Sequence, residues 1–325
     1  MAVLSCSITE LPIELEKEIF DWAVAINDVD QPIETAKSLS LVCKRVKSWM
    51  DRVIYGHVFL DTETIFSKFL FTFRARDKEF FRLHVRSLGI HYTSEHVFRD
   101  TAEIIEACSN IHSLWWLSGK PKKDDWPDFI KSHPRLQMIS LLHHDLTTAL
   151  AFEPSYHSWR QTVRILDLSA KDVHKLDFKV FPNLIIVSLF SHDYLSYNDS
   201  EETFSSILLL GVLANVPLLE CLILGVDPSD VPVSSDSPVE SDVWIVEVRS
   251  ELSFIKGIHD PRLVVMPMLT FSLWKEDVMG VHSYWDRALS MVQKQREPTS
   301  SPAGLQSSEH HIRVVASDLG TVKRD

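Results

Sequence analysis

Short apolar segments, separated by polar stretches, recur along the chain from residue 85 onward. Each segment has an apolar residue, a second one three positions later and a third two positions after that. The seven sets are Val85/Leu88/Ile90, Ile111/Leu114/Trp116, Leu136/Ile139/Leu141, Val163/Leu166/Leu168, Leu184/Val187/Leu189, Leu219/Leu222/Leu224 and Leu263/Met266/Met268. Proline lies two positions before the first apolar residue in four of the sets, as Pro134, Pro182, Pro217 and Pro261. The pattern predicts seven short, buried strands that follow turns.

The predicted strands recur at a nearly constant distance. The middle positions 88, 114, 139, 166 and 187 are separated by 26, 25, 27 and 21 residues, and the last two gaps are longer. A period of about 20 to 29 residues is typical of leucine-rich repeats. In such an array each unit adds one strand to a parallel sheet and stacks its aliphatic side chains on those of its neighbours. We therefore expect an irregular leucine-rich repeat-like α/β solenoid over residues 61–293.

Periodic segments between the strands predict helices for the outer layer of the array. Residues 94–110 precede the second strand and residues 199–216 precede the sixth. After the last strand, Lys275 to Arg296 has apolar residues at helical spacing, which are Val278, Val281, Trp285, Leu289 and Val292. Because terminal units of a solenoid need a cover, we expect this segment to be one capping helix at the open end.

Three segments need separate interpretations. Residues 227–242 are acidic and rich in Ser and Pro, which predicts a mobile loop; the glycine and ligand spacing of a calcium loop are missing. Residues 297–325 are polar and without periodicity, which predicts a disordered tail. Ile207 to Val226 is long enough for a membrane span, but Pro217 interrupts it. A helix ending near Ala214, followed by a strand from Leu219, is the alternative that we favour.

The N-terminal residues 8–60 show helical periodicity. Thr9 can cap a helix whose first turn contains Pro12, and apolar residues then recur at steps of three or four. A polar break over residues 27–35 precedes a second periodic run that ends near Trp49. Two or three short helices cannot bury all of these apolar side chains among themselves. Some of them should contact a partner or the following domain.

The segment LPIELEKEIF, followed about twenty residues later by SLSLVCKRVKSW, resembles an F-box. The resemblance implies a small helical bundle that binds the Skp-family adaptor of a cullin-RING ubiquitin ligase. The matching positions imply that the adaptor-binding residues are Leu11, Pro12, Leu15, Ile19, Phe20, Leu39, Val42 and Cys43. The family usually has Trp three residues after the Cys, where this chain has Val46, and the nearest aromatic residue is Trp49. The linker between the two runs is also longer than in the shortest members.

These features predict an adaptor with two binding regions. The F-box implies attachment to an SCF-type ligase core, and the repeat surface would bind a client protein that the sequence does not identify. The side chains between the aliphatic positions should point away from the core, on the inner curve of the array. Trp115, Ser140, Asp167 and Ser188 are adjacent there and are the candidates for client contact. The alternative is a ligase-independent interaction scaffold, whose N-terminal helices only cap the repeats.

Composition and charge exclude several other classes of partner. The chain has 33 basic and 45 acidic side chains and a net charge of −12, so its surface repels nucleic acid and anionic lipid on average.

The N-terminus lacks the basic flank and apolar core of a secretory signal. Four widely separated cysteines, Cys6, Cys43, Cys108 and Cys221, form no zinc or redox motif. We expect a cytoplasmic or nuclear protein.

No motif for catalysis or cofactor binding occurs in the sequence. Phosphate-binding Gly-rich loops, nucleophile elbows and zincin motifs are missing, and the whole chain has nine glycines. His143, His144 and Asp145, like His310 and His311, lack further ligands at metal-binding spacing. We therefore expect no enzyme, no metal and no cofactor. A catalytic set assembled from distant residues would leave no motif, so that alternative stays open at this point.

Overall fold

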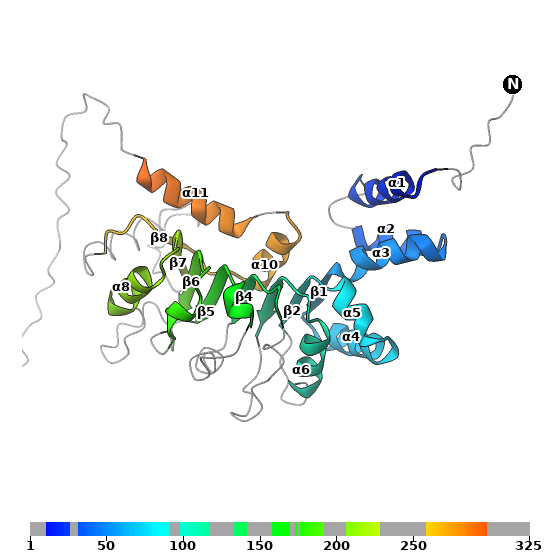
Figure 1. Ribbon diagram of the computed structural model, residues 1–325, viewed down its shortest axis with the longest axis horizontal. Coiled ribbons are helices and arrows are strands. Elements are labelled where there is room, and N and C mark those ends of the chain that lie inside the picture. The colour runs from blue at the N-terminus through cyan, green and yellow to red at the C-terminus, as the bar shows by residue number, and fades with distance from the viewer. Residues whose placement is uncertain are drawn as a thin grey trace, which may run out of the picture.

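The structure is a computed structural model in which ten stretches of the chain are described. These are residues 11–26, 32–91, 98–117, 133–141, 158–169, 173, 176–191, 206–227, 258–281 and 283–297. Figure 1 shows one parallel β-sheet with helices on both of its faces and three further helices beyond its first strand. The mixed α/β class expected from the sequence is confirmed.

The sheet contains eight parallel strands whose spatial order is their order in the chain. They are β1 (His57–Leu60), β2 (Ser87–Ile90), β3 (Ser113–Trp116), β4 (Met138–Leu141), β5 (Ile165–Ser169), β6 (Ile186–Ser191), β7 (Cys221–Val226) and β8 (Leu263–Pro267). All seven predicted strands are present. The first strand, β1, was not predicted, because the sequence analysis assigned residues 57–60 to the N-terminal helical region.

Strand register places the predicted middle positions in one row across the sheet. Val58 of β1 begins the row, which continues through Leu88, Leu114, Ile139, Leu166, Val187, Leu222 and Leu263. The prediction was wrong in register for the last strand, since Leu263 takes the middle place that was given to Met266. The run Leu263–Met266 is apolar at every position, and such a run fits the spacing in more than one register.

Helices α4 (Glu63–Ala75), α5 (Lys78–His84), α6 (Phe98–Ala107) and α8 (Ser206–Asn215) cover one face of the sheet (Figure 1). The row from Val58 to Leu263 faces this side and forms the main hydrophobic core together with side chains of these helices. Short 3-10 turns, η5 (Ser158–Gln161) and η7 (Phe178–Val180), replace helices in two of the connections. Helices α6 and α8 confirm the predicted helices before the second and sixth strands.

The segment from Ile207 to Val226 folds as a short helix, a turn and a buried strand. Helix α8 ends at Asn215 and β7 begins at Cys221, as the position of Pro217 predicted. Within the part of the chain that the structure describes, no helix has both the length and the apolar character needed to cross a membrane.

The expected single capping helix is wrong in two respects. Helices α10 (Phe271–Val278) and α11 (Tyr284–Arg296) are separate, with Gly280 between them at a φ of 72°. They lie over the second face of the sheet, where α10 contacts β2 and β3 and α11 contacts β7 and β8 (Figure 1). The sheet carries apolar side chains on this face as well, including Trp115 and Ile223. Covering these side chains removes apolar surface from water, which stabilises the fold.

Three helices precede the sheet, namely α1 (Ile13–Ile26), α2 (Pro32–Leu39) and α3 (Lys44–Gly56). Their small core consists of Val24, Ala36, Val46 and Met50, with Phe20, Leu39 and Trp49 packed against it. Arg76 connects this bundle to the sheet region, because its guanidinium lies 5.1 Å from the ring of Tyr55 on α3 and 4.1 Å from the ring of Phe80 on α5.

Several sequence predictions fall outside the described residues. They concern Thr9, the proposed loop at residues 227–242 beyond Asp227, the tail beyond Glu297, and the histidines at positions 143, 144, 310 and 311 with the neighbouring Asp145.

Candidate interaction surfaces

Helix α1 has apolar side chains on two sides. Phe20 and Val24 point inward and pack in the small core of the bundle. Leu15, Ile19 and Trp22, at steps of four and three residues, form a stripe on the outside, where their side chains are 48%, 53% and 66% exposed. The residue spacing aligns the three on one helix face. A protein that functions as a monomer rarely exposes such a stripe of apolar side chains to water.

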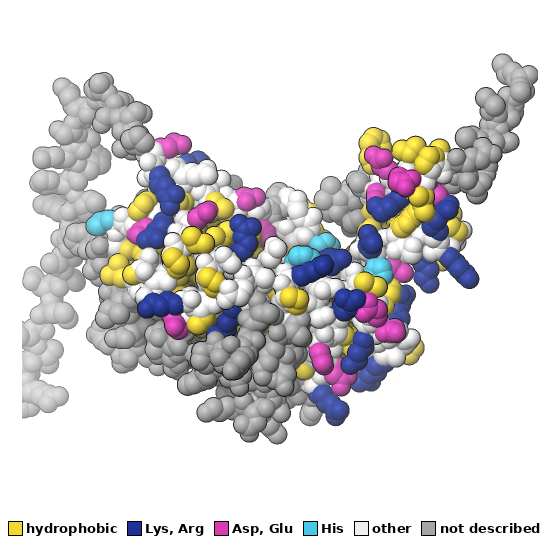
Figure 2. Space-filling view, in the orientation of Figure 1, with side chains coloured by type: hydrophobic (Ala, Val, Ile, Leu, Met, Phe, Trp, Pro, Cys, Tyr) yellow, Lys and Arg dark blue, Asp and Glu magenta, His cyan; other side chains and the backbone are white. Residues whose placement is uncertain are grey.

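The turn from α2 to α3 exposes a second pair of apolar side chains. Leu41 and Val42 are 86% and 61% exposed, and Cys43, the N-cap residue of α3, is exposed beside them. Figure 2 shows hydrophobic side chains gathered over α1 and the adjoining helices. We call Leu15, Ile19, Trp22, Leu41 and Val42 the outer apolar surface.

The eight residues that the F-box resemblance selected divide into two groups. Pro12, Leu15, Ile19, Val42 and Cys43 are exposed, whereas Leu11, Phe20 and Leu39 are half-buried. Phe20 and Leu39 pack against the core of the bundle, so they support the surface from within. Trp22 and Leu41 were not selected, although Trp22 continues the apolar spacing that begins at Leu15 and could have been found from it.

An ion pair between a buried carboxylate and an exposed arginine connects α1 to α3. Glu16 on the inner side of α1 is nearly inaccessible to water and pairs with Arg45 at the start of α3. The Arg45 guanidinium also lies 5.8 Å from the ring of Trp49, which is 6.1 Å from the ring of Phe20. Val46, where the F-box family usually has Trp, is fully buried in this core. It therefore contributes to packing and not to the exposed surface.

The four residues proposed for client contact do lie side by side, as predicted. Trp115 pairs with Ser140, Ser140 with Asp167, and Asp167 with Ser188 in neighbouring strands. Their expected exposure was wrong, because each of the four is at most 1% exposed. Trp115 and Ile186, another residue of this face, belong to a cluster that is completed by side chains of α10 and α11. In this arrangement none of the four can contact a client.

Asp167 is a carboxylate enclosed between the sheet and the C-terminal helices. The Ser140 hydroxyl on β4 donates a hydrogen bond to its Oδ2 atom. Burial raises the pKa of Asp167 to about 6, and this is the largest effect; the hydroxyls of Ser140 and Ser188 favour the charged form and partly oppose the shift. A charged carboxylate at this place weakens the contact between the two layers.

Aromatic rings fill the interface between α10 and the first strands. Trp274 is fully buried, and its ring centroid lies 5.8 Å from that of Trp115 and 5.8 Å from that of Phe59. Phe271 stacks on His91 with centroids 5.1 Å apart. Gly89 on β2 permits this packing, because a Cβ atom there would lie 2.6 Å from ring carbons of both Phe271 and Trp274.

Gly89→Ala is expected to lower the free energy of unfolding by about 1–3 kcal/mol, the usual range for overpacking a buried site. The added methyl group pushes the rings of α10 away from the sheet. Urea unfolding followed by far-UV circular dichroism measures the change. Gly211→Ala on α8, where a Cβ would meet nothing within 4 Å, is the matched control and should be neutral or stabilising. Equal stability of Gly89→Ala and the natural chain would contradict the packing described for α10.

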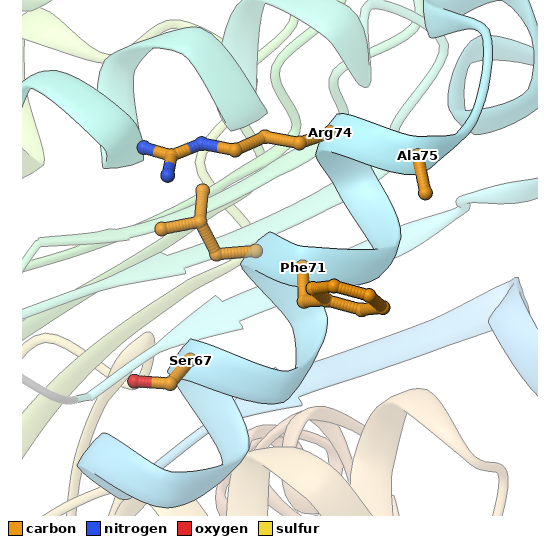
Figure 3. Close-up of a pocket in the computed structure, with 5 residues that line it drawn as sticks. Ser67, Phe71, Arg74 and Ala75 are labelled. Atoms are coloured by element: carbon orange, nitrogen blue, oxygen red, sulfur yellow. The ribbon is translucent and has the colours of Figure 1, made fainter.

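A shallow pocket of about 560 Å³ lies along α4, on the opposite side of the sheet from α10. Its lining residues are Ser67, Leu70, Phe71, Arg74 and Ala75. Figure 3 shows the labelled side chains of Ser67, Phe71, Arg74 and Ala75 on this helix. Arg74 is already paired with Asp100 at 2.8 Å, and Ser67 has no base among the lining residues. The described residues contain no group of three or more side chains suited to hold a metal ion. We find no basis for catalysis in this lining.

Comparisons of the chain with family models, with curated proteins and with solved structures find no match. The interpretation of the surfaces therefore depends on their own geometry. The outer apolar surface on α1–α3 is exposed, whereas the second face of the sheet is covered by the chain's own helices.

Proposed function

We propose that the chain is a substrate-recognition adaptor of an SCF-type cullin-RING ubiquitin ligase. In this proposal α1–α3 form an F-box bundle that binds a Skp-family adaptor, and the sheet region is a degenerate leucine-rich repeat-like solenoid that holds a client protein. The observation that supports it most is the outer apolar surface, with Trp22 and Leu41 largely exposed. It occurs on the segments whose sequence resembles an F-box.

The energetics of the outer apolar surface favour a protein partner. Burying one large apolar side chain contributes about 1.5–3 kcal/mol, and five such residues are exposed here. Trp is a frequent anchor in protein interfaces. The ion pair between the buried Glu16 carboxylate and Arg45 and the packed Phe20 ring hold α1 in place before a partner binds. A surface that is ordered in advance loses less conformational entropy on binding.

The solenoid part of the proposal is supported by the arrangement of the strands. Each strand pairs only with its neighbours in the chain, and the aliphatic row from Val58 to Leu263 repeats once per strand. In five of the seven connections the described residues form helices or short 3-10 turns, which lie between β1 and β2, β2 and β3, β4 and β5, β5 and β6, and β6 and β7. Local stacking of similar units is the defining property of a repeat array.

In this function the chain itself makes and breaks no bond. It would hold a client lysine close to the ligase enzyme, which raises the effective concentration of the two reacting groups and orients them. The client remains unidentified. It would bind a surface other than the covered face around Asp167.

Leu15→Asp is expected to weaken binding to a purified Skp-family adaptor by at least about 30-fold, the loss typical of a central interface residue. The substitution places an unpaired charge where the adaptor would bury an apolar side chain. Isothermal titration calorimetry with the full chain measures the affinity. Leu210→Asp on α8 makes the same chemical change at a side chain of matching exposure, 50% against 48% for Leu15, and should bind like the natural chain.

Two results would contradict the proposal. One is that the natural chain does not bind the adaptor at micromolar concentrations. The other is that Leu15→Asp and Leu210→Asp bind equally well. Circular dichroism of both variants checks that they are folded. Absence of adaptor binding in a folded chain would leave the ligase-independent scaffold as the remaining function of the outer apolar surface.

A further inference from the structure

The segments that lead into the first five strands carry basic side chains and no acidic ones. Asp and Glu are missing from all of them, which are residues 52–56, 84–86, 109–112, 133–137 and 161–164. Their arginines, which we call the basic edge, are Arg52, Arg86, Arg135 and Arg164. The chain as a whole has a net charge of −12, so positive charge is concentrated at the amino ends of β1 to β5.

Backbone hydrogen bonds align these segments side by side. The Arg86 N–H donates to the Gly56 carbonyl at 2.8 Å, and the His112 N–H donates to the Arg86 carbonyl at 2.7 Å. The Gln137 N–H donates to the His112 carbonyl, and the Arg164 N–H donates to the Gln137 carbonyl, both at 2.8 Å. Because neighbouring strands lie about 4.8 Å apart, the backbones of Arg86 and Arg164 are separated by about 14 Å along the edge.

The arginines of the basic edge have no counter-charge. None of the four forms an ion pair within the part of the chain that the structure describes. Arg52, Arg135 and Arg164 are exposed, and Arg86 is half-buried. The Nη1 atom of Arg86 is buried and has no hydrogen-bond partner among the described residues. A partly desolvated guanidinium without a counter-charge is unfavourable, and an anion beside it offsets this cost.

Arg76, which follows α4, adds positive charge at the β1 end of the edge. Its guanidinium lies 4.1 Å from the Phe80 ring, and the His84 ring lies 4.5 Å from the same ring. The Asp51 carboxylate is also present here, with its Oδ1 atom 4.0 Å from Nη1 of Arg76. This carboxylate faces Arg76, so it leaves the charge of the basic edge unbalanced.

Two histidines lie close enough to the arginines for their pKa values to be affected. Burial is the largest cause that lowers the pKa of His84, and the charge of Asp51 opposes it. Burial also lowers the pKa of His112, followed by the charges of Arg86 and Arg135. The further charges that lower the pKa of His84 are those of Arg52, Arg76 and Arg86. The basic groups therefore act together as one region of positive potential.

We propose that the basic edge binds an acidic segment of another protein, held in extended form across the amino ends of β2 to β5. One carboxylate or phosphate group cannot reach from Arg86 to Arg164, whereas four or five residues of an extended chain cover this distance at about 3.3 Å per residue. Alternate residues of such a segment point to the same side, so Asp or Glu at these positions can face the arginines.

The residue type of the edge fits this ligand. A guanidinium group binds a carboxylate through two parallel N–H donors and stays charged at every physiological pH. The binding surface lies on the sheet region, away from the outer apolar surface on α1–α3. It goes beyond the proposed adaptor function and does not depend on it.

The probe for this surface is a rhodamine-labelled decapeptide of alternating Glu and Ser, and the decapeptide of alternating Gln and Ser is its neutral control. Fluorescence anisotropy with the full chain at low ionic strength measures both affinities. The Glu peptide should bind at least about tenfold more tightly than the Gln peptide, because only carboxylates form charge-assisted hydrogen bonds with the arginines. Added salt should weaken this binding, since it screens exposed charges.

Arg86→Gln and Arg135→Gln should each weaken binding of the Glu peptide about tenfold, the effect of losing one charge-assisted hydrogen bond. Arg99→Gln on α6 is the matched control, because it removes the same charge from a side chain that is 90% exposed and lies outside the edge. Its affinity should stay within about twofold of the natural chain. Circular dichroism checks that the three variants are folded.

Three results would overturn the proposal. The first is that the Glu peptide does not bind, or binds no better than the Gln peptide. The second is that Arg99→Gln weakens binding as much as Arg86→Gln, which would mean that net charge alone attracts the peptide. The third is that inorganic phosphate or a thymidine oligonucleotide binds at least as tightly as the Glu peptide. The adaptor titration with Leu15→Asp measures a different surface, so either proposal can fail without the other.

Discussion

Trp274→Ala is expected to lower the free energy of unfolding by about 3–5 kcal/mol, the range for truncating a large aromatic side chain in a core. Trp274 is fully buried and lies between the rings of Phe59, Trp115 and Phe271. Alanine leaves a cavity that these rings cannot fill without leaving their own contacts with the sheet. Chemical denaturation monitored by far-UV circular dichroism measures the loss.

Trp22→Ala is the matched control, since it makes the same chemical change on a helix where the side chain is 66% exposed. It should change the stability of the isolated chain by at most about 0.5 kcal/mol. A small effect of Trp274→Ala, close to that of Trp22→Ala, would mean that α10 is not docked on the sheet in solution.

Leu166→Ala is expected to cost about 2–5 kcal/mol. Leu166 occupies the middle place of β5 and is fully buried between Ile139 and Val187 of the neighbouring strands. Because each strand of the sheet is stacked on the next, a cavity here weakens the contact between both halves of the sheet. The midpoint of urea unfolding should fall, and hydrogen exchange should show lower protection in β4, β5 and β6 than in the natural chain.

Leu210→Ala on α8 is the control for this substitution, because Leu210 is half-exposed and lies outside the row. Its effect should be near zero, apart from a small gain in helix propensity. If the two leucine variants unfold at the same urea concentration, the aliphatic row does not form the core that the register describes.

The strand positions could be predicted because their signal is local and repeated. Leu88, Leu114, Ile139, Leu166, Val187 and Leu222 were assigned to equivalent places from spacing alone, and the register agrees. The error in β8 and the omission of β1 have different causes. Leu263–Met266 follows a turn at Pro261 but is apolar at every position, so its spacing does not fix the register. His57–Leu60 directly follows a helix, so no turn marks the start of this strand.

The helical bundle was also predicted in outline, since helix starts and apolar periodicity are local features. Helix α1 ends where the predicted polar break over residues 27–35 begins, but α2 starts at Pro32 inside that break, and the second periodic run is divided between α2 and α3. Which apolar residues remain exposed could not be read from periodicity. Phe20 and Ile19 are neighbours in the chain, but Phe20 packs inward and Ile19 faces water, because the positions of α2 and α3 decide which side of α1 is covered.

The sequence by itself determined the parallel strands, the aliphatic row and the N-terminal helices, because each depends on residues that are close in the chain. Only the tertiary structure decided whether the side chains of Trp115, Ser140, Asp167 and Ser188 are exposed or buried. Their adjacency follows from strand register, but their burial comes from α10 and α11, which are distant in the chain. An amphipathic helix can bury its apolar face against any complementary surface, and only the folded chain selects one.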